Sequence, residues 1–216
     1  MTTSTTRRRG RPRSIPEAQR REELLDAAME LFLDQGIELT TVAQIAARAG
    51  VASGTVYLYV GSKESLVAAL RARFREAMAG EIERLVDGWA GPFAGLIDAL
   101  VDLTFELHMT HRTEIDLFRR QIPADAIREV AESRRRYNAP LTRAIQQAAA
   151  RGEAAVPGGD PELLAYLLSG AIEESVYACL TFGFPADAEA LRVAARAMAH
   201  KLLNPAAGVL AATGGA

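Results

Sequence analysis

The chain has 216 residues and a formal net charge of −2, with 49% hydrophobic and 24% charged residues, which are ordinary proportions for a globular protein. No stretch approaches the roughly 20 uninterrupted apolar residues that span a bilayer, so we expect no membrane span and no secretory signal. The single cysteine, Cys179, cannot form an internal disulfide, which favours the reducing cytoplasm as the compartment.

The amino-terminal segment differs in charge from the rest of the chain. It contains five arginines within residues 1–14 and no acidic residue, so the remaining residues carry 20 basic and 27 acidic side chains. We expect residues 1–16 to form a disordered basic arm that binds a polyanion. The run from Arg8 to Arg13 resembles an AT-hook, which lays Arg9, Arg11 and Arg13 into the minor groove of A·T-rich DNA. A solubilising tail that touches phosphates without sequence preference is the alternative, and both stay open.

Apolar residues recur at intervals of three and four along the chain, and Gly or Pro separates successive segments. This pattern predicts an all-α fold of about nine helices. Asp160 and Asp187 are expected to cap the last two long helices, and residues 204–216 are expected to form a flexible tail. The expected helices cover 17–35, 42–49, 53–60, 63–86, 93–111, a short segment from Thr113, 125–151, 161–182 and 187–203.

The segment Thr55–Val60 presents a conflict, because Thr, Val and Tyr favour β-strands. No other segment offers a convincing partner strand, and an isolated strand is not stable. We therefore expect a short helix that tertiary packing stabilises against its own propensity.

Residues 41–60 fit a helix-turn-helix. Thr41 and Gln44 form a capping box at the start of the first helix, and Ala46 is small enough for two helices to cross closely. Gly50 supplies the positive φ that the turn requires. The second helix then presents Ser53, Gly54 and Tyr57 to base edges in a major groove.

Here the sequence resembles the DNA-binding domain of the TetR (tetracycline-repressor) family of bacterial transcriptional regulators. The resemblance covers residues 20–70, about a quarter of the chain, and its matching runs are 24–36, 40–51 and 53–66. The resemblance implies a helix-turn-helix DNA-binding domain over 17–66, and a helical effector-binding and dimerisation domain over 67–203.

The family pattern also implies roles for individual residues. Ser53, Gly54 and Tyr57 would contact base edges, while Thr41, Thr55, Tyr59 and Lys63 would contact phosphates. For Tyr57 and Tyr59, packing in the protein core is the alternative.

The resemblance further implies a small-molecule effector, largely apolar, and a homodimer through residues 160–203. The partner would be a double-stranded, palindromic operator. As a hypothesis, aromatic side chains and two polar side chains line the effector pocket. For the aromatic side chains, packing in the protein core is the alternative. Glu174 is included because it falls on an otherwise apolar face, although pairing or exposure also accounts for it. The hypothetical pocket residues are Trp89, Phe93, Phe105, His108, Phe118, Tyr137, Tyr166, Glu174 and Tyr177.

Other functional classes have little support in the sequence. His108 and His111 lack a third ligand of clear spacing, so we expect no metal site and no cofactor. No phosphate-binding Gly-rich loop or catalytic triad context occurs, so we expect no enzyme. The sequence therefore favours a ligand-responsive regulator, most often a repressor. An architectural DNA-binding protein without an effector is the alternative.

Overall fold

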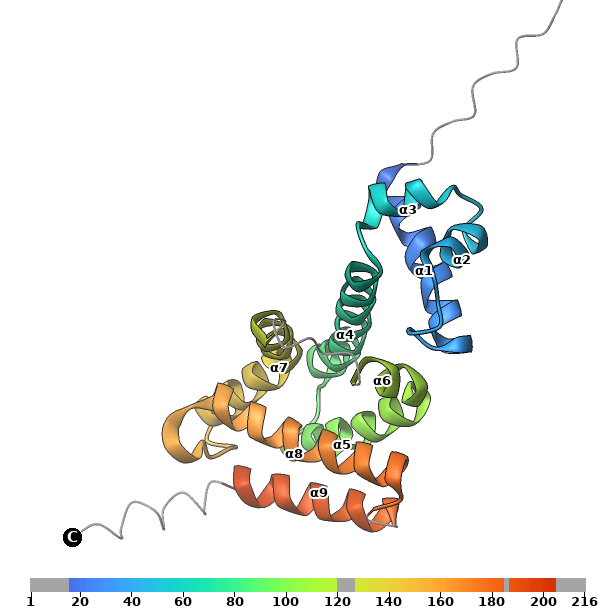
Figure 1. Ribbon diagram of the computed structural model, residues 1–216. Helices are drawn as coiled ribbons and strands as arrows, with labels where there is room; N and C mark the ends of the chain where they lie inside the picture. Colours follow the sequence, from blue (N-terminus) through green and yellow to red (C-terminus); the bar gives the residue numbers. More distant parts are fainter. Residues whose placement is uncertain (1–15, 120–126, 185–186, 205–216) are drawn as a thin grey trace, which may run out of the picture. The chain divides into compact units, whose positions relative to one another are not determined.

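The computed structural model describes residues 16–119, 127–184 and 187–204 of the chain. These residues form nine α-helices, and no β-strand occurs among them, which confirms the predicted all-α fold (Figure 1). The chain divides into two compact units, Met1–Ala69 and Leu70–Ala216. The domain boundaries expected from the sequence remain predictions. The basic arm with Arg9, Arg11 and Arg13, and the tail from residue 205 onward, lie outside the described residues.

The first unit contains α1 (Glu17–Gln35), α2 (Val42–Arg48), α3 (Ser53–Val60) and the start of α4 (Lys63–Gly88). Its core consists of apolar side chains that recur every three or four residues along α1 and pack against α2 and α3. The fully buried members of this core are Leu24, Ala28, Phe32, Ile45, Val56 and Leu66.

The predicted strand–helix conflict at Thr55–Val60 is resolved in favour of the helix, since α3 spans this segment. Val56 is the buried side chain of α3, and it packs into the core that α1 and α2 form. Tertiary packing therefore overrides the strand propensity of this segment.

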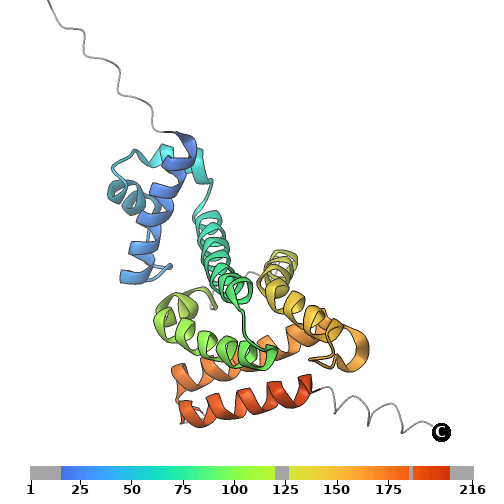
Figure 2. The same cartoon turned by 180° about the vertical axis from the view of Figure 1, so that it is seen from behind.

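The second unit contains the rest of α4, then α5 (Phe93–Thr110), α6 (Arg112–Arg119), α7 (Ile127–Ala150), α8 (Pro161–Phe182) and α9 (Ala188–Leu203). A short 3-10 turn, Pro157–Gly159, precedes α8. Figure 2 and Figure 1 show α8 and α9 side by side, with α5 packed on both and α7 along α8. Buried apolar residues of α5, α7, α8 and α9 form the main core of this unit.

Two helix starts in the second unit follow the predicted capping chemistry. The side chain of Asp160 accepts hydrogen bonds from the backbone amides of Glu162 and Leu163, and that of Asp187 caps α9 in the same way. The short helix α6 begins one residue before the expected Thr113, because the carbonyl of His111 already accepts the amide of Ile115 at 2.9 Å.

Helix α8 is long enough and apolar enough to cross a membrane by length and composition, with a mean hydropathy of 1.3 in its most apolar 18 residues. A core helix of a water-soluble protein meets the same criteria, so length and composition alone are weak evidence for a membrane span. Two adjacent carboxylates, Glu173 and Glu174, interrupt the apolar sequence of this helix.

Candidate nucleic-acid interface and effector cavities

Side-chain hydrogen bonds define the start of α2, and backbone hydrogen bonds define the turn between α2 and α3. Thr41 accepts a hydrogen bond from the amide of Gln44, whose side chain reaches back to the amide of Thr41 at 2.8 Å, so the predicted capping box is present. Gly50 has a φ of 66°, which only glycine adopts without strain, and the amide of Val51 donates to the carbonyl of Ala46 at 2.9 Å. The turn thus fixes the crossing of α2 and α3.

Helix α3 presents one face to solvent. Tyr57 is 57% exposed and Leu58 is 78% exposed, while Ser53 and Gly54 at the start of the helix are also exposed. The side chains of Thr55 and Tyr59 are half-buried. The helix therefore combines a rigid attachment to the core with an accessible face, as a helix that enters a DNA groove requires.

Lys63 has a different environment from the one that the sequence suggested. Its ammonium group donates hydrogen bonds to the carbonyl oxygens of Ile37 at 2.8 Å and Thr40 at 3.0 Å. The side chain is therefore engaged in holding the loop before α2 against the start of α4. The sequence pattern gave no indication of this role, because the loop carbonyls lie more than twenty residues earlier in the chain.

This geometry predicts that Lys63→Met lowers the free energy of unfolding by about 2 kcal/mol, because hydrogen bonds from a charged donor to the loop carbonyls are lost. The measurement is urea denaturation of the full chain. Lys201, the other lysine and exposed on α9, gives a matched control, and Lys201→Met should leave the unfolding curve unchanged. Equal effects of the two substitutions would show that the loop does not depend on Lys63.

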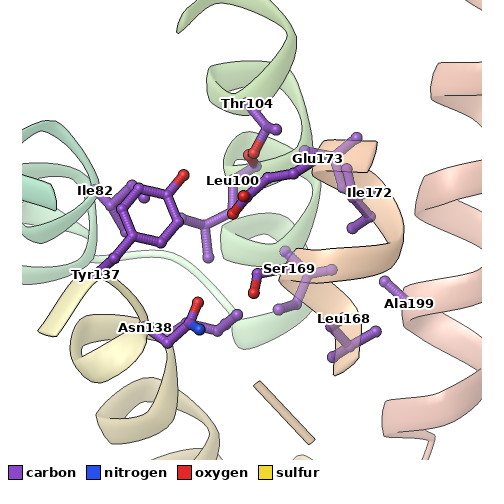
Figure 3. Close-up of a pocket in the computed structure, with 13 residues that line it drawn as sticks. Ile82, Leu100, Thr104, Tyr137, Asn138, Leu168, Ser169, Ile172, Glu173 and Ala199 are labelled. Atoms are coloured by element: carbon purple, nitrogen blue, oxygen red, sulfur yellow. The ribbon is translucent and has the colours of Figure 1, made fainter. Parts of the chain in front are cut away.

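The second unit contains three cavities that share Tyr137 as a wall. The first has a volume of about 50 Å³, and apolar side chains of α4, α5 and α8, such as Ile82, Leu100 and Ile172, form most of its lining (Figure 3). We call it the apolar cavity. It is far smaller than the 300–1,000 Å³ of typical small-molecule pockets, so a drug-sized ligand requires it to open.

The second cavity, about 80 Å³, is lined by charged groups as well as apolar ones, and we call it the charged cavity. Arg75, Arg119, Arg134 and Glu173 all contribute to its wall. The third is a groove of about 390 Å³ between α4 and α7. Tyr137 and Glu173 line both the apolar and the charged cavity.

Glu173 is the carboxylate that turns inward. Its side chain is 14% exposed, and one of its oxygens lies 3.2 Å from Nη1 of Arg134. Burial raises the pKa of Glu173, against the opposing effects of Arg134 and Tyr137. Burial likewise raises the pKa of Tyr137, which Glu173 raises further, so this phenol stays neutral.

Glu174 is exposed and paired, which is the alternative that the sequence left open. Its side chain is 63% exposed and pairs with Arg119. It points in a different direction from its neighbour Glu173, because successive residues of a helix are rotated by about 100°. The spacing of four between Ser169, Glu173 and Tyr177 is the sequence pattern that would have indicated which carboxylate faces inward.

The other predicted pocket residues occupy several environments. Tyr137 and His108 line cavities, and Phe118 packs on Phe74, which lines the charged cavity. Tyr166 is 50% exposed and does not line any of these three cavities. The remaining members, whose ligand-binding roles stay predictions, pack in apolar clusters: Trp89, Phe93, Phe105 and Tyr177.

Trp89 is held locally. Its indole Nε1 donates to the carbonyl of Pro92 at 3.1 Å, and its ring lies where a Cβ on Gly95 would approach it to 3.0 Å. Trp89 therefore fixes the turn between α4 and α5 instead of facing a cavity.

His108 is buried, and its Nδ1 lies 2.8 Å from the carbonyl of Thr104. Burial lowers the pKa of His108 below its usual value, although the Thr104 hydrogen bond opposes this shift. As the pH falls through about 6.5, the unfolded chain takes up the proton first, so stability is lost on the acid side. We expect the free energy of unfolding to fall less between pH 7.5 and 5.5 in His108→Asn than in the unchanged protein.

Urea denaturation at the two pH values measures this difference. Met109→Asn, at an exposed and non-titrating position of the same helix, serves as the control and should keep the parental loss of stability. If the free energy of unfolding fell equally in His108→Asn and in the unchanged protein, the lowered pKa of buried His108 would be contradicted.

Comparison with known proteins agrees with the geometry of the first unit. The family model described as "Bacterial regulatory proteins, tetR family" matches residues 24–70. The repressor KstR2 of Rhodococcus jostii is 39% identical over 87 residues, which are 40% of this chain and 42% of that protein. The fatty acid metabolism regulator of Bacillus subtilis is 41% identical over 63 residues, 29% of this chain and 31% of that protein. The chain thus matches less than half the length of these curated relatives.

Solved structures extend the likeness in fold to most of the chain. A TetR-family transcriptional regulator from Pectobacterium atrosepticum superposes with a TM-score of 0.66 at 21% identity, covering 90% of this chain and 98% of that one. The regulator FadR of Bacillus subtilis, solved in complex with stearoyl-CoA, gives a TM-score of 0.63 at 24% identity, covering 85% and 98%. Residues 24–70 thus match the TetR family of bacterial regulatory proteins in sequence, and the likeness in fold to regulators of that family extends over most of the chain.

Proposed function

We propose that the protein is a ligand-responsive transcriptional regulator, acting as a repressor, that binds a palindromic operator as a homodimer and leaves it when an effector binds. The observation that carries the proposal is α3, whose exposed Tyr57 face is attached rigidly to a buried core. The relatives that are named repressors support this choice over an enzyme, and a DNA-binding regulator belongs in the cytoplasm.

On DNA, α3 would lie in the major groove with Ser53, Gly54 and Tyr57 at base edges. Thr41, Thr55 and Tyr59 flank that face and would contact phosphates. Lys63 would take part mainly by holding the loop before α2, with a phosphate as an additional partner. The arm with Arg9, Arg11 and Arg13 would add contacts in the minor groove or to phosphates.

The dimer would form through α8 and α9. On α8, Leu163, Tyr166 and Leu167 are spaced by three and four residues and form an exposed apolar stripe. Further large apolar side chains are exposed on the same two helices, namely Phe182, Val193 and Leu202. Exposed apolar surface of this extent is typical of a surface that a second protein covers. Two copies packed through these helices would make a four-helix bundle, and twofold symmetry would suit a palindrome.

The effector would act by changing the spacing of the two α3 helices in the dimer. For release, it must bind the DNA-incompetent spacing more tightly than the competent one. The cavities around Tyr137 are the sites that we propose for it.

Binding-site selection with genomic fragments and the purified full chain tests the proposal. We expect the recovered sequences to share an inverted repeat with half-sites about one helical turn apart. Recovery of fragments without a shared motif would instead support an architectural DNA-binding protein.

A further inference from the structure

The charged cavity has an excess of cations. Arg75, Arg119 and Arg134 line it, and the carboxylate of Glu173 is the acidic group in its wall. Arg119 is already paired with the exposed Glu174. Burial and the neighbouring Arg134 lower the pKa of Arg75, which means that the surroundings disfavour its positive charge. Buried like charges are costly unless an anion compensates them.

Glu173 compensates these cations incompletely. One of its oxygens meets Arg134, while the other, Oε1, is buried and has no hydrogen-bond partner among the described residues. The buried amide nitrogen of Asn138, in the wall of the apolar cavity, also has no partner among them. Figure 3 shows the Glu173 carboxylate extending from α8 toward the ring of Tyr137. Polar groups left unsatisfied beside a cavity indicate that another molecule completes the site.

The apolar and the charged cavity lie on either side of a shared wall. Tyr137 and Glu173 line both cavities. The ring of Tyr137 is part of a buried apolar cluster, so moving it would disrupt the core, whereas the Glu173 side chain can rotate without disturbing that cluster. Movement of Glu173 from Arg134 would open a path from the guanidinium groups to the apolar side chains. The combined space has an anion-binding end and an apolar end.

We propose that the effector is an organic anion with an aliphatic body, whose acidic group binds Arg134 and Arg75 in place of Glu173 and whose body fills the apolar cavity. This inference rests on the proposed function, because it names the effector class of the same cavities. Guanidinium groups bind carboxylates in a bidentate manner, which suits the Arg134 side chain once Glu173 has left it. Glu173 would thus be an internal substitute for the acid of the effector.

Isothermal titration of the full chain, without DNA, tests the proposal with three probes that share one aliphatic body: octanoate, 1-octanol and octylamine. We expect octanoate to bind at least about tenfold more tightly than the other two, since only its carboxylate can accept charge-assisted hydrogen bonds from the guanidinium groups. No measurable octanoate binding, or binding of octanol that equals it, would overturn the proposal.

Two substitutions sharpen the test. Arg134→Gln should remove the preference for octanoate, and Glu173→Gln should strengthen octanoate binding several-fold while leaving octanol unchanged, because the competing carboxylate is gone. Arg135→Gln is the matched control, since Arg135 is an exposed arginine of α7 that pairs with Glu162 and lines none of the three cavities. Weaker octanoate binding in Glu173→Gln would contradict the role of Glu173, and thermal melts of each variant report whether it is folded.

The two proposals fail separately in this design. Loss of octanoate selectivity in a protein that still selects an inverted repeat refutes the anion site and leaves the regulator intact. Octanoate selectivity in a protein that selects no operator supports the anion site and refutes the regulator.

Discussion

Replacing Tyr57 with alanine is expected to weaken binding to the selected operator by about 10- to 100-fold, the effect of losing a base contact worth about 1–3 kcal/mol. The side chain is 57% exposed on α3, so its removal should leave the free energy of unfolding almost unchanged. Titration of a labelled operator duplex and urea denaturation measure the two quantities.

Val56→Ala is the matched control on the same helix. Val56 is buried, so truncating it should lower the free energy of unfolding by about 1–3 kcal/mol through lost packing. Operator affinity should change little where the variant is folded. If Tyr57→Ala destabilised the fold and Val56→Ala did not, the assignment of the exposed and buried faces of α3 would be wrong.

Leu167→Glu is expected to raise the dissociation constant of the dimer by more than about 100-fold, because two carboxylates would be buried per interface at a cost of several kcal/mol. Leu167 is 58% exposed and lies in the apolar stripe of α8. Operator affinity should fall with it, since a monomer contacts a single half-site. Sedimentation velocity measures the association, and an operator titration measures the consequence.

The control for this prediction is Met109→Glu. Met109 is a similarly exposed apolar residue near the end of α5, outside the proposed dimer surface. It should leave both association and operator affinity unchanged. A dimer that tolerates glutamate at Leu167 would require an interface elsewhere on the chain.

Much of the fold was accessible from local chemistry. The capping box at Thr41 and the aspartates before α8 and α9 are short-range features, and the structure confirms the helix starts that they predict to within one residue. The α3 segment required a tertiary argument, because its own propensity favours a strand. The absence of a partner strand was sufficient to predict the helix.

The cavities were less predictable from the sequence. Which side chains line them depends on how each helix is rotated about its axis and on contacts between residues that lie far apart in the chain. The sequence singled out Glu174, although Glu173 is the buried neighbour of Arg134 and Tyr137. Arg75 reaches the same cavity from α4, some sixty residues earlier than Arg134, and no periodicity links the two. Aromatic residues indicated a pocket, yet several of them fill the core, as aromatic residues do in most proteins.

The central claim is that α3 enters the major groove at two symmetric positions. Protection of the selected operator from dimethyl sulfate tests it directly, because this reagent methylates guanine N7 in the major groove and adenine N3 in the minor groove. We predict two clusters of protected guanine N7 atoms, related by the inverted repeat and about one helical turn apart. Unprotected guanine N7 atoms throughout the bound site, with protection confined to adenine N3, would contradict the account.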